Sequence, residues 1–237
     1  DYNTAMSYPS TADFLEDLRQ SGQLALIEAE ISADQEVAEI TRRIARAGGR
    51  PLLFGHVDGK ETPLVTNLLA TEERLCRAFG AKSIRDLAAQ VASWVELREP
   101  ANWLDRLRLP ASQGGVGKFP PRLVKTGVCQ QVVKLGNDVD LGELPAVRCG
   151  CDQSYPAITA AQVFTADVES GQPAVGRYDS LVLDRNRLAV GWLAYDEPAR
   201  KLLDYRRHNR RMPVAVVLGG DPVGLLAAMA PLPFAAD

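Results

Sequence analysis

The sequence predicts an α+β fold in two parts, and two observations carry this prediction. Up to about residue 112, amphipathic helical patterns alternate with short strand patterns, which is typical of a small α/β domain. From Lys118 onwards strand patterns dominate and short turns separate them, as in an antiparallel sheet or barrel. With 237 residues, 46% of them apolar, the chain can bury a core without disulfides. We expect a domain boundary near residues 112–120, which gives parts at 1–115 and 116–237.

The N-terminal part opens with a helix and a strand. A hydroxyl at position 10 or 11 can cap a helix whose apolar residues Phe14 and Leu18 recur at helical spacing, and Gly22 ends it. Residues 24–31 then alternate as a strand.

A second helix is expected from Asp34 to residue 47, where Gly48 and Gly49 end it. Two strands follow, joined by an Asp-Gly turn. The remaining N-terminal patterns are strands at 51–57 and 63–69, helices at 71–79 and 83–96, and partial helical character at 98–113 before the glycines of 114–117.

The second part contains strand patterns at a spacing typical of a meander. An extended segment begins at Phe119, residues 129–135 alternate as a strand, and residues 136–138 turn. The later elements are expected to be strands within 158–167, 176–184 and 187–195, a helix at 198–211, a strand at 213–218, and a turn at 219–222.

Charge and composition exclude several classes of function. The net charge is −3 and the pI is about 5.6, so the chain has no general attraction for nucleic acid or for an anionic membrane. No apolar stretch reaches the length of a membrane span, and the first residues lack the pattern of a signal peptide. Scattered cysteines fit a reducing compartment. We therefore expect a cytoplasmic protein with no nucleic-acid and no membrane partner.

Isolated candidate motifs favour structural roles over catalysis. Cys149 and Cys151 have too few histidines or cysteines nearby to form a zinc site. The basic run at 200–211 has an apolar side, which favours a solvated helix face or a subunit contact over an anion site. His56 follows an apolar strand and fits a surface or hydrogen-bonded role. The glycines at 219–220 lack the Lys-Ser/Thr of a phosphate loop, and two histidines offer little for a hydrolase triad.

Four stretches in the correct order resemble the UbiD family of prenylated-flavin-dependent decarboxylases over essentially the whole chain. They are Phe14-Leu-x-x-Leu18 with Gly22-x-Leu24, then Gly48-Gly49-x-Pro51-Leu-Leu-Phe54 with Val65-Thr-Asn-Leu68, then Lys118-Phe119-Pro120-Pro121 to Asp138-Val-Asp-Leu141 and Leu144-Pro145, and lastly Met212-Pro-Val-Ala-Val216 through Leu218-Gly-Gly-Asp-Pro222 to Ala230-Pro-Leu-Pro233.

This resemblance implies a fold and a reaction. The fold would be a small N-terminal α/β domain followed by a split β-barrel, related to flavin reductases, that holds the flavin. The implied reaction is reversible, non-oxidative removal of CO₂ from an aromatic or α,β-unsaturated acid, with prenylated FMN or FMN as cofactor. Family members also carry a C-terminal α/β domain used in oligomerisation.

The residues expected to carry the chemistry depart from the family pattern. Two strands of the family read roughly Asn-x-Gly-x-Tyr-Arg and Met-His-Trp-Gln, in which Asn and His hold a metal and Arg faces the substrate carboxylate. Here Ala174 and Gly191 replace the metal ligands, and Asp179 replaces the arginine. The segments implied to line the cofactor are Ala174, Val175, Gly176, Arg177, Tyr178, Trp192 and Leu193, and we expect no divalent metal site.

Two explanations of these departures remain open from the sequence. The chain is a degenerate family member that acts as an accessory subunit, or Arg177, two residues from Asp179, replaces the lost cation in a remodelled active site. A third possibility is a flavin-binding or carrier module. An accessory role implies a homo-oligomer or a hetero-oligomer with a full-length UbiD-like paralogue.

Overall fold

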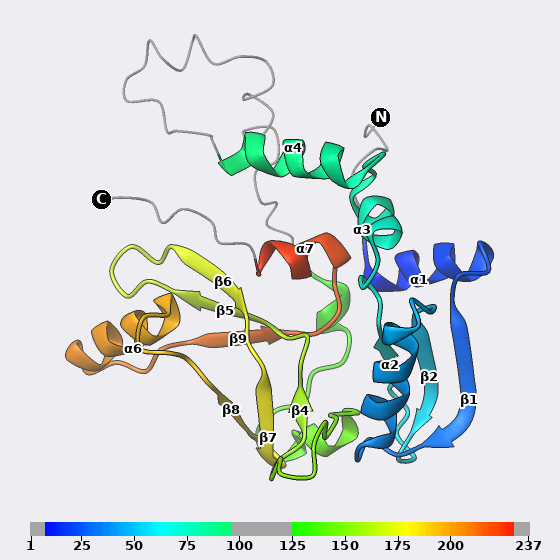
Figure 1. Ribbon diagram of the computed structural model, residues 1–237. Coiled ribbons are helices and arrows are strands. Elements are labelled where there is room, and N and C mark those ends of the chain that lie inside the picture. The colour runs from blue at the N-terminus through cyan, green and yellow to red at the C-terminus, as the bar shows by residue number, and fades with distance from the viewer. Residues whose placement is uncertain (1–7, 96–124, 230–237) are drawn as a thin grey trace.

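A parallel strand pair with a helical crossover forms the centre of the N-terminal part. The computed structural model describes residues 8–95 and 125–229 (Figure 1). Strand β1 (Ala25–Ile31) runs parallel to β2 (Leu52–Val57), and β3 (Leu64–Thr66) pairs with β2 in the antiparallel sense. Parallel neighbours need a long connection, and helix α2 (Glu36–Arg46) supplies it.

This sheet and helix α2 enclose one of two hydrophobic cores. Phe54 and Val57 on β2 are fully buried, and Val37 on α2 is 1% exposed. Ile40 and Ile44 pack against the same cluster from the next turns of α2, as the helical spacing of these residues requires.

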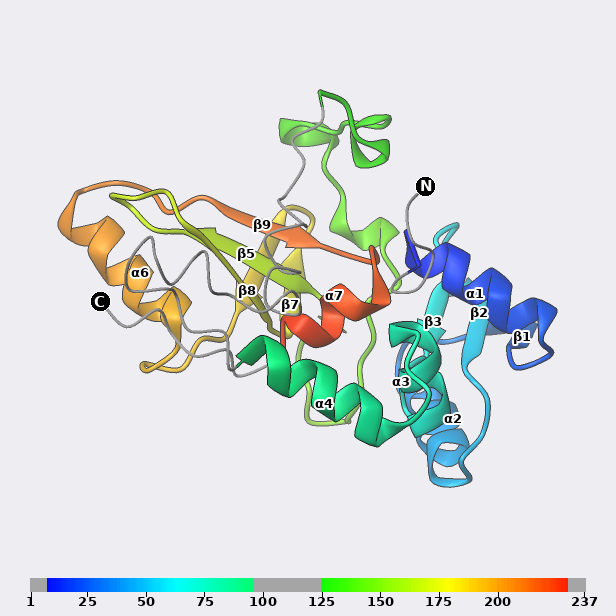
Figure 2. The same ribbon diagram turned by 90° about the horizontal axis from the view of Figure 1, so that it is seen from above.

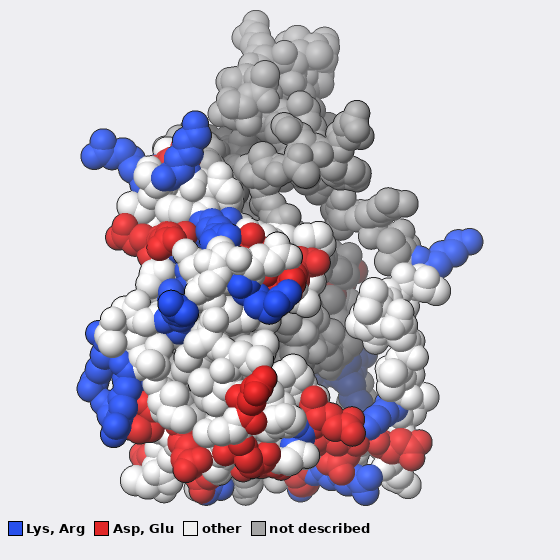
Figure 3. All heavy atoms as spheres, turned by 90° about the vertical axis from the view of Figure 1, so that its right-hand side faces the viewer, with Lys and Arg blue, Asp and Glu red and all other residues white. Residues whose placement is uncertain are grey.

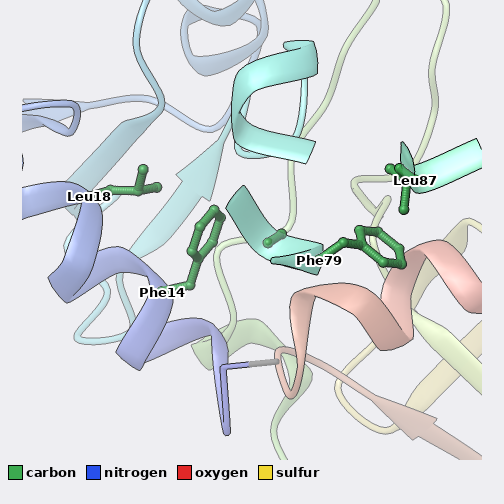
Figure 4. Close-up of a cluster of buried hydrophobic side chains, with 5 residues drawn as sticks. Phe14, Leu18, Phe79 and Leu87 are labelled. Atoms are coloured by element: carbon green, nitrogen blue, oxygen red, sulfur yellow. The ribbon is translucent and has the colours of Figure 1, made fainter. Parts of the chain in front are cut away.

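The second core lies among helices from both ends of the chain. Phe14 and Leu18 of α1 (Thr11–Gln20) meet Phe79 of α3 (Glu72–Phe79) and Leu87 of α4 (Ile84–Val95), as Figure 4 shows. Helix α7 (Pro222–Ala227) adds Val223 and Leu226 to this cluster, so the N-terminal core is completed by a C-terminal helix. The backbone N–H of Thr11 also donates to the carbonyl of Gly220, at 2.5 Å.

The β-rich part consists of two three-stranded sheets, with strand orders β4-β7-β8 and β6-β5-β9. All the pairs are antiparallel. Helix α6 connects β8 to β9 (Figure 1). The bounds are β4 (Ala157–Ile158), β5 (Gln162–Ala166), β6 (Pro173–Arg177), β7 (Ser180–Asp184), β8 (Arg187–Val190), α6 (Glu197–Arg207) and β9 (Val214–Val217).

The α+β class is confirmed, and the described strands of the β-rich part form two open sheets instead of a closed barrel. The strand predicted at 129–135 is wrong, because this segment begins in a 3₁₀ turn at Val128–Gln130 and has no ladder partner among the described residues. The turn predicted at 136–138 is present as a 3₁₀ turn at Gly136–Asp138. The run predicted at 176–184 divides into β6 and β7, which belong to different sheets. Strand β8 ends at Val190, well before residue 195.

Helix α7 replaces part of a predicted turn. Asp221 accepts a hydrogen bond from the backbone N–H of Val223, and Pro222 occupies the first helical turn, where its missing N–H costs nothing. The domain boundary near 112–120, the helical pattern at 98–113, the break at 114–117 and the extended segment at Phe119 lie outside the described residues. No described helix is long and apolar enough to cross a membrane.

Candidate site at the junction of the two sheets

The candidate residues come from two different sheets and meet at their junction. Ala174 and Arg177 lie on β6, whereas Gly191 and Trp192 follow the end of β8. The rings of Tyr178, just after β6, and Trp192 meet edge to face, with centroids 6.4 Å apart and planes at 78°. The structure therefore brings together the two segments that the sequence singled out.

Arg177 and Asp179 form an ion pair at this junction. Nη1 of Arg177 donates to Oδ1 of Asp179 at 2.9 Å and to the carbonyl of Thr159 at 2.5 Å. The two residues were expected on one strand face, but β6 ends at Arg177, so Asp179 lies between β6 and β7. The guanidinium that could have replaced a lost cation is thus already engaged with a carboxylate of the same chain.

The ring of Tyr178 packs over Gly176. A Cβ at this position would lie 2.5 Å from Cε2 of Tyr178, closer than real Cβ atoms approach. The backbone N–H of Tyr178 donates to the carbonyl of Ala161, which holds the residue after β6 against the neighbouring strand. The ring therefore occupies the space above Gly176.

Two carboxylates at the start of α6 lie close enough to Tyr178 to affect its ionisation. Burial raises the pKa of Tyr178, and the nearby carboxylates of Asp196 and Glu197 raise it further. Asp196 accepts a hydrogen bond from the backbone N–H of Leu193 at 2.7 Å, and Glu197 pairs with Lys201 at 2.8 Å. Sequence reasoning missed both carboxylates, because nothing in the linear pattern places the start of α6 beside Tyr178.

The residues present do not fit a metal-bound flavin phosphate. Ala174 offers no side-chain oxygen, and a Cβ added at Gly191 would meet nothing within 4 Å, so that position is open and has no ligand. No group of three or more His, Cys, Asp or Glu residues among those described could hold a metal ion. A phosphate at this junction would meet Asp179 and Asp196, with Arg177 already paired.

Two buried donors at the junction have no hydrogen-bond partner in the described part of the chain. They are Nε1 of Trp192 and Oγ of Ser180, the first residue of β7. Val175 and Leu193, both implied to line a cofactor, are 41% and 57% exposed and contribute only apolar surface. The junction thus offers aromatic and apolar surface together with unused donors, while Arg177 and Lys201, two described cations at or near it, are both paired with carboxylates.

The other sequence candidates lie elsewhere. His56 is exposed on β2 opposite Glu30, a surface position. In the basic run, Lys201 is 9% exposed and paired, whereas Arg206 and Arg207 are exposed on α6. Figure 3 shows the opposite side of the molecule, that of α1 and β1, where acidic and basic side chains are interspersed.

Among the described residues, the surface is also hollowed at two places away from the sheet junction. One of about 630 Å³ runs along α2 beside Cys149, and one of about 230 Å³ lies between the N-terminal sheet and β7, lined in part by Asp58, Lys60 and Val182. None of the residues implied to line a cofactor lines either cavity, and of the other sequence candidates Cys149 borders the larger one.

Two models of one protein family match most of the chain. The 3-octaprenyl-4-hydroxybenzoate carboxy-lyase N-terminal domain matches residues 15–93. The 3-octaprenyl-4-hydroxybenzoate carboxy-lyase Rift-related domain matches residues 122–237. An uncharacterized protein of Aquifex aeolicus (strain VF5) is 32% identical over 228 residues, which are 95% of this chain and 47% of that protein.

Solved structures of decarboxylases share the fold. Vanillic acid decarboxylase of Sedimentibacter hydroxybenzoicus, in closed form, has a TM-score of 0.78 and 25% identity, over 96% of this chain and 46% of that one. An evolved dimeric form of the UbiD-class enzyme HmfF from Pelotomaculum thermopropionicum, in complex with prFMN, has a TM-score of 0.75 and 22% identity, over 93% and 47%. The chain spans about half the length of each of these relatives.

Proposed function

The chain belongs to the UbiD family of carboxy-lyases, and on this premise we propose that it is a catalytically degenerate member that acts as an accessory subunit. Its proposed setting is a decarboxylase system that acts on aromatic or unsaturated acids. The names of its structural relatives, a vanillic acid decarboxylase and a prFMN-bound UbiD-class enzyme, support that setting. The proposed partner is a second copy of the chain or a full-length UbiD-like paralogue.

The ion pair between Arg177 and Asp179 is the observation that carries this proposal. The resemblance places a carboxylate-binding arginine where Asp179 stands, and a substrate carboxylate there would meet repulsion instead of a bidentate, charge-assisted pair. Arg177 could in principle take over the role, but its Nη1 already donates to Asp179 and to the carbonyl of Thr159. The pair therefore neutralises the cation nearest to the position at which a substrate acid would bind.

The missing metal ligands support the same proposal. When bound in a family member, prenylated flavin supplies the electron-handling chemistry of decarboxylation. Ala174 and Gly191 provide no ligand for a cation that would hold its phosphate, and the carboxylates around Tyr178 oppose an anion. The residues of this chain pack the aromatic pair and close the junction, and we assign them no step in a reaction.

Activity of the chain alone tests the proposal. The protein would be co-expressed with a flavin prenyltransferase, purified, and assayed for CO₂ release from vanillate and 4-hydroxybenzoate. We expect no release above that of protein-free buffer. CO₂ release that is abolished by Arg177→Gln would contradict the proposal, because it would assign Arg177 to a remodelled active site.

A second candidate function, a flavin-holding module, is favoured by the unused donor of Trp192. Its buried Nε1 has no partner in the described structure, and a flavin carbonyl could accept from it after a small rearrangement. The absorbance and mass spectra of the co-expressed protein decide between the candidates. A bound yellow chromophore that is lost in Trp192→Phe would favour the module, whereas colourless wild-type protein would exclude it.

A further inference from the structure

An apolar arm extends from the β-rich part of the molecule. We define the arm as residues 128–135, the green segment that projects at the top of Figure 2. Its four large apolar side chains are far more exposed than side chains in a hydrophobic core. Exposed apolar side chains that lie together on a surface are typical of an interaction site. The exposed fractions are Val128 82%, Val132 76%, Val133 65% and Leu135 73%.

The arm is held at its base, but its own backbone forms no ladder. Lys134 pairs with Glu143, and the N–H of Leu141 donates to the carbonyl of Arg185, so the segment after the arm is fixed to the β7–β8 turn. The sequence of the arm predicts a strand, whereas the structure gives only a 3₁₀ turn at Val128–Gln130. The strand pattern of the arm is explained if the strand with which it pairs belongs to another chain.

Strand β9 offers the complementary edge. It pairs with β5 on one side only and forms one edge of its sheet. Two of its valines are unusually exposed for a strand, Val214 at 42% and Val217 at 38%, and Leu218, directly after the strand, is 43% exposed. Among the described residues, no backbone group pairs with its outer edge, and such an edge is a template for an added strand.

We propose that the arm of one copy adds as a strand to the outer edge of β9 in a second copy, and that the exchange is reciprocal. In Figure 2 the arm and β9 lie toward the same side of the molecule, so one neighbour can engage both. A reciprocal exchange forms a closed pair and leaves no edge free for further growth. This inference rests on the self-association in the proposed function and assigns the surface responsible.

Cross-linking from the native thiol of the arm tests the contact. Cys129 is exposed, and Cys149→Ser with Cys151→Ser removes the other exposed thiols. In that background Ala215→Cys places a thiol on β9, and Ala29→Cys places one at an exposed site on β1 as the matched control. With a short bis-maleimide, we expect a covalent dimer with Ala215→Cys at several times the yield of the control. Equal yields from the two variants would overturn the proposal.

Charged substitutions in the arm give an independent measurement. Val132→Lys with Val133→Lys should weaken dimerisation by about tenfold or more in sedimentation, because buried lysines would replace apolar contacts. The control is Leu26→Lys, a 56% exposed residue on β1. If the arm variant dimerises as the wild type does, the proposed contact between the arm and β9 is wrong, although the protein still self-associates. A wild-type monomer at every concentration would overturn both, whereas the CO₂ assay alone decides catalytic degeneracy.

Discussion

At the scale of single residues, Arg74 is a buried cation that binds three backbone carbonyls in the N-terminal part. It is 6% exposed, and its guanidinium donates to the backbone carbonyls of Gly49, Asn67 and Leu68. Burial lowers the pKa of Arg74, which still stays protonated at neutral pH. The end of α2, the end of β3 and the start of α3 are thereby tied to one side chain.

Arg74→Met should therefore destabilise the protein strongly. Methionine fills much of the space but leaves three carbonyls without a donor, and we expect a loss of about 2–4 kcal/mol in the free energy of unfolding. Chemical denaturation followed by circular dichroism measures it. The control is Arg85→Met, at an exposed position on α4, which should change the free energy of unfolding by less than about 0.5 kcal/mol. Equal losses in the two variants would show that the hydrogen bonds of Arg74 do not stabilise the fold.

Asp179 should be the residue that most directly prevents binding of a carboxylate. In Asp179→Arg the ion pair is lost and two guanidinium groups are available, so affinity for 4-hydroxybenzoate should rise by about tenfold or more. Calorimetry measures binding, and CO₂ release should remain absent because the metal ligands are still missing. Asp184→Arg, which breaks a comparable exposed pair with Arg187, is the control and should leave binding unchanged. Tight binding by the wild type would contradict this account.

The candidate site could be predicted in part from single residues. The sequence shows that Ala174 and Gly191 have no side-chain ligand for a metal, and that an aspartate, Asp179, stands where the family resemblance implies an arginine. The edge-to-face contact of Tyr178 with Trp192 and the carboxylates of α6 are not, because they depend on how two sheets meet. A local pattern contains no information on which of two sheets a strand will join.

At the scale of elements, a bidentate ion pair links α1 to α3. Asp17 accepts from Nε and Nη2 of Arg77 at 2.7 and 2.9 Å and from the hydroxyl of Tyr8 at 2.6 Å. The hydrogen bond from Arg77 is the main cause that lowers the pKa of Asp17 below its ordinary value of 3.8, and the bond from Tyr8 adds to it. The folded state thus holds this carboxyl in its charged form more strongly than the unfolded chain does.

The pair should make stability depend on pH in the acid range. Because the folded pKa is depressed, the stabilisation is fully present only above about pH 5 and is lost as pH falls past the ordinary value of 3.8 and through the folded pKa. Asp17→Asn should lower Tm at pH 7 and flatten the fall in Tm between pH 4 and pH 2. Glu28→Gln, at an exposed position on β1, should keep the wild-type profile. Parallel profiles for Asp17→Asn and the wild type would contradict the assignment.

Helices that begin and end at recognisable capping residues were predicted well from the sequence. Strands, which depend on a partner far away in the chain, were predicted less well. Helix α3 begins after a Thr71 cap and ends at Gly80 in a left-handed conformation, both of which are legible in the sequence. The strand expected at 129–135 failed because a strand needs a ladder partner. Helix α7 was missed although Asp221 and Pro222 form a recognisable helix start, since the preceding glycines favoured a turn.

At the scale of the whole molecule, α7 joins the two parts into one unit. Leu226 packs against the cluster of Phe14 and Phe79, so Leu226→Ala should cost about 1–3 kcal/mol and should raise hydrogen exchange in α1 and α3 as well as in α7. Leu203→Ala, at a half-exposed position on α6, should affect neither α1 nor α3. Faster exchange confined to α7 would show that the two parts are stable independently.

The contact between Thr11 and Gly220 also sets an order of events during synthesis. The two residues are 209 positions apart, and a ribosome that adds about 5–20 residues per second needs roughly 10–40 s to cover that distance. For that period Phe14 and Leu18 have been translated while the helix that completes their core has not. Helix α1 must therefore wait for α7, and a chaperone that shelters apolar segments of nascent chains would find a binding site at α1 during this interval.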